Sequence, residues 1–169
     1  MSPYKHPPLK RHPSLQPLSR DHYGGLVQAD RLCKAAAADV EASVRRGAVA
    51  DFLDAWHREI AEHFEDEERL FRDLMNEPET AKLHEQHQAL RTLAEQAHDH
   101  RRQVDPGADW CRTLGEALRD HIRWEERELF PAIQARATPE QLETLARHTA
   151  PIEQRRGRST GDRLGQGSP

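Results

Sequence analysis

The chain has 169 residues, which is enough for one domain with a substantial hydrophobic core. Its 25 Lys and Arg residues against 29 Asp and Glu residues give a formal net charge of -4, which argues against a nucleic-acid-binding protein with a basic excess. No run of about 18 apolar residues exists and the N-terminus has no apolar leader, so neither a membrane span nor a secretory signal is expected. Two cysteines are too few for a disulfide framework and fit a cytoplasmic location.

The first part of the chain predicts an arm followed by two long helices. Five prolines disfavour a helix over residues 1–18 and favour an extended arm. A first helix is expected over 19–46, between Ser19 as the N-cap and Gly47 as the stop, and a second over 51–76. The residues expected to face inward from the first helix are His22, Leu26, Ala29, Cys33, Ala36, Val40 and Val44.

The second half of the chain predicts three more helices and a tail. Helical periodicity continues over 80–103 and again over 109–136. A proline in the first turn then starts a short helix within 137–150. Residues 151–169 are rich in Gly, Arg and Ser with almost nothing to bury, so a disordered tail is expected there.

The overall pattern is all-α, because alternating runs and hairpin turn signals are absent. Four long helices with short connections predict an antiparallel up-down-up-down four-helix bundle over 19–136, with an extended N-terminal arm and a short C-terminal helix. The first helix begins just before His22, whereas its neighbours extend further. The arm is therefore expected to pack over that end of the bundle through Tyr4, Leu9, Leu15 and Leu18.

Histidines and carboxylates interrupt the apolar faces of all four long helices. Two segments, one in the second helix and one in the fourth, repeat the pattern H-x-x-x-E-E-R. The spacing places the histidine and the first glutamate of each segment on one helical face, one turn apart. The first and third helices each add one inward histidine. The six residues are His22, His63, Glu67, His87, His121 and Glu125.

Six such residues on inward faces predict a common metal site, since buried unpaired histidines and carboxylates are costly. Four histidines and two glutamates suit two metal ions, and this ligand type suits iron, with zinc or manganese as substitutes. An ion-paired bundle without metal is the alternative. A ferritin-like site would need two E-x-x-H motifs, and only Glu95 to His98 provides one.

The order of these motifs, with Leu129-Phe130-Pro131 after the last, resembles the hemerythrin-like HHE cation-binding domain family over residues 19–136. The resemblance implies a four-helix bundle around a non-haem di-iron centre with an oxygen bridge. It assigns the four histidines as terminal ligands and the two glutamates as ligands that bridge the irons.

One departure from the family bears on function. Its oxygen carriers have a further histidine one turn before the position of His87, where this chain has Leu83. His84 lies nearby and is interpreted as a surface residue, with metal ligation as the alternative. One coordination position on each iron would then stay open, which is what metal catalysis requires.

The resemblance therefore implies binding of O2, H2O2 or NO, with catalase-like peroxide decomposition or redox chemistry favoured. The alternatives are an O2 or NO carrier or sensor without turnover, and a protein of iron homeostasis. Beyond these small molecules, no nucleic-acid or membrane partner is expected, and the chain is expected to be a monomer or a weak homodimer.

Two further features leave alternatives open. Gly24 and Gly25 follow His22 and could fray the helix, let a neighbouring helix approach or open a path to the metals. Cys33, His98 and Cys111 fall at a similar height, about 15–17 Å from the metals, and are either a second soft-metal site or ordinary residues of the core and surface.

Overall fold

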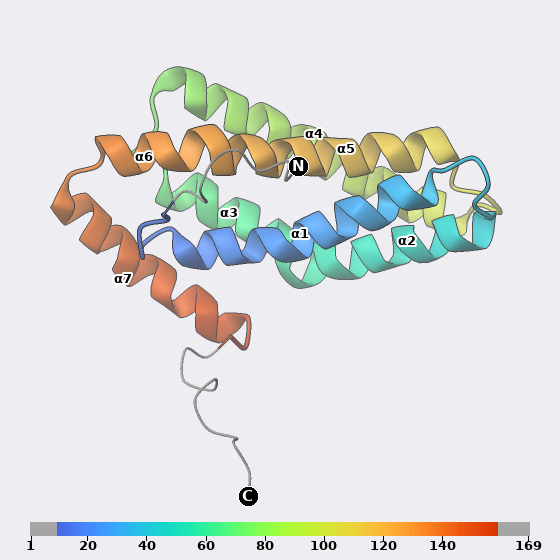
Figure 1. Cartoon of the computed structure of the whole chain (residues 1–169), viewed down its shortest axis with the longest axis horizontal. Coiled ribbons are helices and arrows are strands. Elements are labelled where there is room, and N and C mark those ends of the chain that lie inside the picture. Colours follow the sequence, from blue (N-terminus) through green and yellow to red (C-terminus); the bar gives the residue numbers. More distant parts are fainter. Residues whose placement is uncertain (1–9, 159–169) are drawn as a thin grey trace, which may run out of the picture.

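The computed structural model describes residues 10–158, which are helical and contain no strand (Figure 1). Two of its helical segments are single π-helical turns, in which the backbone bond spans five residues rather than four. The segments are α1 (Gln16–Ala35), α2 (Ala42–Ala55), η1 (Trp56–Ile60), α3 (Ala61–Leu70), α4 (Glu77–Arg102), α5 (Ala108–Trp124), η2 (Glu125–Leu129), α6 (Phe130–Arg136) and α7 (Pro139–Arg155).

Four long helical rods form a bundle along the long axis of the molecule. The rods are α1, the continuous run from α2 through η1 to α3, α4, and the run from α5 through η2 to α6. The helix α7 leaves one end of the bundle at an angle and contacts α1 (Figure 1). The expectation of an all-helical bundle is confirmed for the described residues.

The first predicted helix is wrong in its extent and partly in its face. It ends at Ala35 rather than at residue 46, and Gly47 lies inside α2 rather than ending a helix. The turn interrupts an alanine-rich run with no proline or glycine, because arginines from other segments satisfy its carbonyls. Arg45 donates to Val40 O at 2.7 Å, and Arg112 donates to Ala36 O at 2.9 Å.

The inward column of α1 also differs from the prediction. The predicted Leu26 and Val44 are 38% and 53% exposed. The buried column instead runs through Leu18, His22, Gly25, Ala29 and Leu32. A methyl group built on Gly25 would lie 2.7 Å from Ile122 Cδ1, so this glycine lets α1 approach α5, and the helix is not frayed there.

Both ends of the described chain are more ordered than expected. The helix α1 begins at Gln16, inside the predicted arm, with Pro17 in its first turn where a missing N–H is tolerated. The helix α7 continues to Arg155, beyond the predicted boundary at residue 150, around an internal Pro151. The predictions for Tyr4, Leu9 and residues 159–169 lie outside the described residues.

The hydrophobic core consists of two clusters separated by a polar layer. One cluster contains residues such as Phe52, Phe64 and Leu118, and the other contains Leu83, Phe130 and the ends of the chain. Leu15 and Leu18 are fully buried in the second cluster, as expected for the described part of the arm. Each of the four rods runs from one cluster to the other, and between the clusters it contributes one or two of the six predicted histidines and glutamates. All six are buried.

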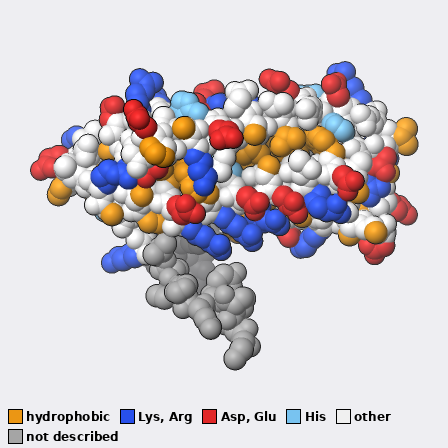
Figure 2. All heavy atoms as spheres, turned by 90° about the horizontal axis from the view of Figure 1, so that it is seen from above, with side chains coloured by type: hydrophobic (Ala, Val, Ile, Leu, Met, Phe, Trp, Pro, Cys, Tyr) orange, Lys and Arg blue, Asp and Glu red, His pale blue; other side chains and the backbone are white. Residues whose placement is uncertain are grey.

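Charged side chains cover the outer faces of the helices. Acidic and basic residues lie interspersed on the face drawn in Figure 2, beside a stretch of apolar side chains. Among residues 10–158, no helix is both long and apolar enough to cross a membrane.

Candidate metal centre

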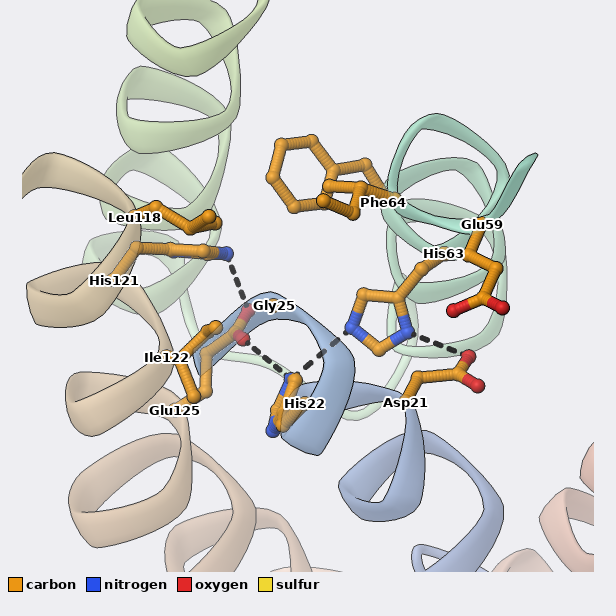
Figure 3. Close-up of a pocket in the computed structure, with 11 residues that line it drawn as sticks. Asp21, His22, Gly25, Glu59, His63, Phe64, Leu118, His121, Ile122 and Glu125 are labelled. Carbon is orange, nitrogen blue, oxygen red and sulfur yellow. Dashed lines mark hydrogen bonds and ion pairs between the residues drawn. The ribbon is translucent and has the colours of Figure 1, made fainter. Parts of the chain in front are cut away.

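Six buried side chains from the four rods meet in the layer between the two apolar clusters. Each arrives from a helical segment whose apolar neighbours face the same interior, so the fold aims the polar side chains inward along with them. The residues are His22 on α1, His63 and Glu67 on α3, His87 on α4, His121 on α5 and Glu125 at the start of η2. Figure 3 shows His22, His63, His121 and Glu125 turned toward one another around a small cavity.

The six side chains form two overlapping groups. Both groups contain Glu67 and Glu125; one adds His22 and His63, and the other adds His87 and His121. Within each group the nitrogen or oxygen atoms that could bind a cation lie within 4.8 Å of one another. The geometry therefore offers two adjacent cation positions with two carboxylates in common.

Each shared carboxylate presents one oxygen to each pair of histidines. Glu67 Oε1 lies 3.0 Å from His63 Nε2, and Glu67 Oε2 lies 3.3 Å from His87 Nε2. Glu125 repeats the arrangement, with Oε2 at 3.0 Å from His22 Nε2 and Oε1 at 3.2 Å from His121 Nε2. Such a carboxylate can bind two cations at once, one through each oxygen.

Six buried atoms that point into this space make no hydrogen bond within the protein. They are both carboxylate oxygens of Glu67, both of Glu125, and the Nε2 atoms of His87 and His121. Leaving so many buried polar atoms without a partner is costly, and a native structure has few of them. The donor set, two carboxylates and four imidazoles, is one that divalent first-row metals accept. The residues present therefore fit a pair of metal ions.

The other ring nitrogen of every histidine is held by a residue outside the centre. Three of these partners are carboxylates: His22 donates Nδ1–H to Glu126 at 2.7 Å, His63 to Asp21 at 3.0 Å, and His87 to Glu68 at 2.7 Å. The fourth is an amide, since His121 donates Nδ1–H to Gln86 Oε1 at 2.8 Å.

These outer partners fix which nitrogen carries the proton. An ionised carboxylate only accepts hydrogen bonds, so Nδ1 must carry the hydrogen, and the Nε2 lone pair of a neutral ring then faces the centre. This is the tautomer and orientation that a metal-binding histidine needs, and a hydrogen-bonded carboxylate also makes the ring a stronger ligand.

The buried groups shift one another's pKa values strongly. Burial opposes protonation of His87, but the nearby carboxylates of Glu125, Glu67 and Glu68 outweigh it and raise its pKa to about 10. Burial opposes ionisation of Glu67, yet the nearby histidines, His63 first, hold its pKa well below the usual range. Burial dominates at His121, which has no carboxylate on Nδ1, and lowers its pKa to about 4. The pKa of Glu125 is also lowered, against its burial, by His121, His22 and His87, so both carboxylates are held ionised, as a cation site requires.

Apolar and aromatic walls surround the centre. Phe64 stacks on the ring of His87, with centroids 3.9 Å apart, and Phe130 stacks on His22 at 5.3 Å. A small cavity of about 20 Å³ adjoins the His22 and His63 side (Figure 3). Ile60, Leu118 and Ile122 supply apolar parts of its lining, together with Gly25 of α1. The cavity has room for a small molecule but not for a large organic substrate.

The remaining predicted residues lie away from the centre. His84 is exposed on α4 and belongs to neither group, whereas Leu83 is fully buried in the second apolar cluster. Cys33 and Cys111 are free thiols, and among residues 10–158 neither belongs to a cluster that could bind a cation. His98 is exposed, with its ring 5.3 Å from that of His57. These positions give no support to a second soft-metal site.

The residues that hold the outer ring nitrogens were not predicted from the sequence. Two of them were visible in the pattern, because Glu68 and Glu126 are the second glutamates of the repeated H-x-x-x-E-E-R segments. Each reaches a histidine on a different helix: Glu68 on α3 holds His87 on α4, and Glu126 in η2 holds His22 on α1. Asp21 and Gln86 had no comparable signal.

Comparison with known proteins agrees with this picture. A family model described as the hemerythrin HHE cation binding domain matches residues 18–150. That span includes all six side chains of the centre and the four outer partners. No curated protein and no solved structure matches the chain.

Proposed function

The chain belongs to the hemerythrin HHE cation-binding domain family, and on that premise we propose that it is a non-haem di-iron protein that acts on O2, H2O2 or NO. Decomposition of peroxide, or related redox chemistry, is the favoured activity. The observation that carries the proposal is the pair of four-residue groups that share Glu67 and Glu125. Each group would hold one metal ion through two histidines, and both carboxylates would bridge the pair. Iron is the favoured metal, with zinc or manganese as substitutes.

Iron held there would supply Lewis acidity and reversible electron transfer. The protein would orient the ligands through the hydrogen bonds on Nδ1 and exclude water with Phe64, Phe130 and the apolar cavity lining. Leu83 supports peroxide or redox chemistry over reversible carrying of O2, because this apolar residue occupies the position where the family's oxygen carriers have a further histidine ligand. The small cavity supports substrates of the size of O2, NO and H2O2.

An up-down-up-down antiparallel bundle is part of the proposal. It is supported by the order in which the rods meet the two apolar clusters: α1 and α4 run from the second cluster to the first, and the other two rods run from the first to the second. The cytoplasmic location and the monomeric or weakly dimeric state stay predictions.

The test is metal analysis and an optical spectrum of the purified full-length protein, followed by addition of peroxide. We expect two irons per chain, near-ultraviolet charge-transfer absorption and rapid evolution of O2. His87→Ala should lose iron and activity, because it removes a ligand from a fully buried position. His84→Ala is the matched control, since it removes an exposed histidine three residues away on the same helix.

Other outcomes separate the alternatives. Two irons with a stable coloured adduct and no turnover would indicate a carrier or sensor. Iron that exchanges readily with a weak chelator would indicate iron homeostasis, for which a site that fills and empties is needed. A folded protein that binds no iron under anaerobic Fe²⁺ loading would contradict the di-iron proposal.

A further inference from the structure

Asp21, the outer partner of His63, joins the centre to the C-terminal end of the described chain. Its side chain is only 3% exposed. Its Oδ2 atom accepts the Nδ1–H of His63 at 3.0 Å, which Figure 3 shows as a dashed line. Like the other three outer partners, Asp21 lies on a segment that also carries a ligand, here His22 on α1, but its other partners come from the C-terminal end of the described chain.

Two arginines that follow the last turn of α7 bind Asp21 from the side away from His63. Arg156 donates Nε to Asp21 Oδ1 at 3.2 Å and Nη2 to Oδ2 at 3.4 Å. Arg158 donates Nη2 to Asp21 Oδ1 at 2.6 Å. The side chain of Arg156 is 3% exposed and that of Arg158 is 30% exposed, so Arg156 is the buried partner.

We propose that Arg156 is a positioning residue of the metal centre, acting through Asp21 to hold the ring of His63 in its metal-binding orientation. The inference rests on the metal-binding part of the proposed function. Arg156 is the buried member of the arginine pair on Asp21 and the one that contacts Oδ2, the atom that accepts the hydrogen bond from His63. Loss of Arg156 would leave Asp21 with only the more exposed Arg158, on Oδ1, so the carboxylate would be free to rotate or to turn toward solvent. Either movement would misalign the hydrogen-bond acceptor that fixes His63 Nδ1.

The competing explanation is that Arg156 only anchors α7 to the bundle. Arg156 also donates Nη1 to Glu62 at 2.7 Å, and Nη2 lies 3.5 Å from the Glu59 carbonyl oxygen. The neighbouring Arg155 supplies a matched control for this role. It binds Glu62 and donates Nη2 to Asp66 at 2.9 Å, and no contact joins it to Asp21. Arg155→Gln therefore weakens the same anchor and removes the same charge but leaves Asp21 supported.

The experiment compares full-length Arg156→Gln and Arg155→Gln, both loaded anaerobically with Fe²⁺. The readouts are iron retained per chain and affinity in competition with a ferrous chelator, with circular dichroism to verify the helical fold. For Arg156→Gln we expect affinity at one of the two iron positions to fall about 10- to 100-fold, the usual effect of losing an outer partner of a ligand. Arg155→Gln should keep both irons at wild-type affinity. Equal behaviour of the two variants would overturn the proposal.

A double-mutant cycle tests whether the effect passes through Asp21. Asp21→Asn keeps the size of the side chain and removes its charge. If Arg156 acts through Asp21, Arg156→Gln should weaken iron binding no further in the Asp21→Asn background. Independent, additive losses would contradict that route.

Imidazole NMR on the metal-free protein provides a readout that does not need iron. The Nδ1–H proton of His63 should be protected and observable in the wild type and in Arg155→Gln, and lost in Arg156→Gln. If wild-type protein binds no iron but this pattern holds, the di-iron function fails and the positioning contact stands. If wild-type protein binds iron and the signal is unchanged in Arg156→Gln, only the present inference fails.

Discussion

The chemistry of the hydrogen-bond partner distinguishes the four histidines of the centre. His22 and His63 both donate a hydrogen bond from Nδ1 to a carboxylate, that of Glu126 and that of Asp21 respectively. In the other pair, His87 donates to the carboxylate of Glu68, whereas His121 donates to the neutral amide of Gln86. Since a carboxylate partner makes an imidazole a stronger ligand, the position between His87 and His121 should hold its metal less tightly.

The variant Gln86→Glu tests this predicted difference in metal affinity between the two positions. The new carboxylate would accept the Nδ1–H of His121, raise the basicity of the ring and tighten metal binding at that position about 10-fold. The measurement is a Zn²⁺ competition titration near pH 8, with Zn²⁺ as a redox-silent probe. Gln88→Glu, which adds the same charge at an exposed position on the same helix, is the control. Identical titrations for the two variants would show that the outer amide does not matter.

At the scale of the elements, close approach of α1 and α5 depends on two glycines. Gly25 faces Ile122, and Gly115 faces Ala29 and Cys33. A methyl group on Gly115 would lie 2.7 Å from Cys33 Sγ and 2.9 Å from the Ala29 carbonyl oxygen, so the backbones would have to separate. This contact brings the helix of His22 against the helix of His121 and thereby sets the width of the centre.

Gly115→Ala should lower the free energy of unfolding by about 1–3 kcal/mol, the usual cost of overpacking a tight interface. Gly47→Ala is the matched control: Gly47 lies inside α2 with nothing within 4 Å of an added methyl group. That variant should gain about 0.4–1 kcal/mol, because alanine restricts the unfolded chain. Chemical denaturation measures both changes. A stabilised Gly115→Ala protein would contradict the close packing of α1 on α5.

Local helix geometry also departs from what periodicity predicts. The π-helical turn η2 begins at Glu125, and η1 ends three residues before His63. Each turn adds a residue to the local helical repeat and so shifts the phase of the face that follows. The apolar stripe of a regular helix cannot indicate such a shift, whereas packing against the other rods can stabilise it.

At the scale of the whole molecule, ion pairs hold the ends of the bundle together. At the end remote from α7, Arg45 of α2 binds Asp105 in the loop after α4 through both Nε and Nη2, each at 2.7 Å. The hydrogen bond from Arg45, and then the one from the Gly107 N–H, lower the pKa of Asp105 to about 2. At the opposite end, Arg156 and Arg158 join α7 to Asp21.

The Asp105 pair predicts a specific acid dependence. The folded pKa of about 2 lies below the ordinary value of 3.8, so its contribution to stability is complete above about pH 4 to 5 and is lost as the pH falls toward 2. Asp105→Asn should therefore be less stable than wild type at pH 7, with a gap that narrows between pH 4 and pH 2.

Urea denaturation of both proteins across this pH range measures the gap. Asp30→Asn is the control, because Asp30 is 59% exposed and, within residues 10–158, pairs with Lys34 on the same helix. Its difference from wild type should be small, because an exposed ion pair contributes little to stability. A gap for Asp105→Asn that does not change with pH would contradict the prediction.

The sequence by itself determined the helical class and the six residues that meet at the centre. Both follow from spacing within single helices: a four-residue interval places His63 with Glu67 and His121 with Glu125 on one face, whatever lies opposite. Helical periodicity was likewise predicted over 80–103 with His87 facing inward, and α4 buries His87 between Leu83 and Leu90.

Only the tertiary structure decided the features that depend on contacts between segments. The turn after Ala35 has no breaker in the sequence and exists because Arg45 and Arg112 bind its carbonyls from elsewhere. The sequence predicted a disordered tail from residue 151. The role of Arg156 depends on its ion pair with the buried Asp21, which only the packing of α7 on α1 reveals. Periodicity encodes which side of a helix is buried; which distant residue completes a hydrogen bond depends on how the helices pack.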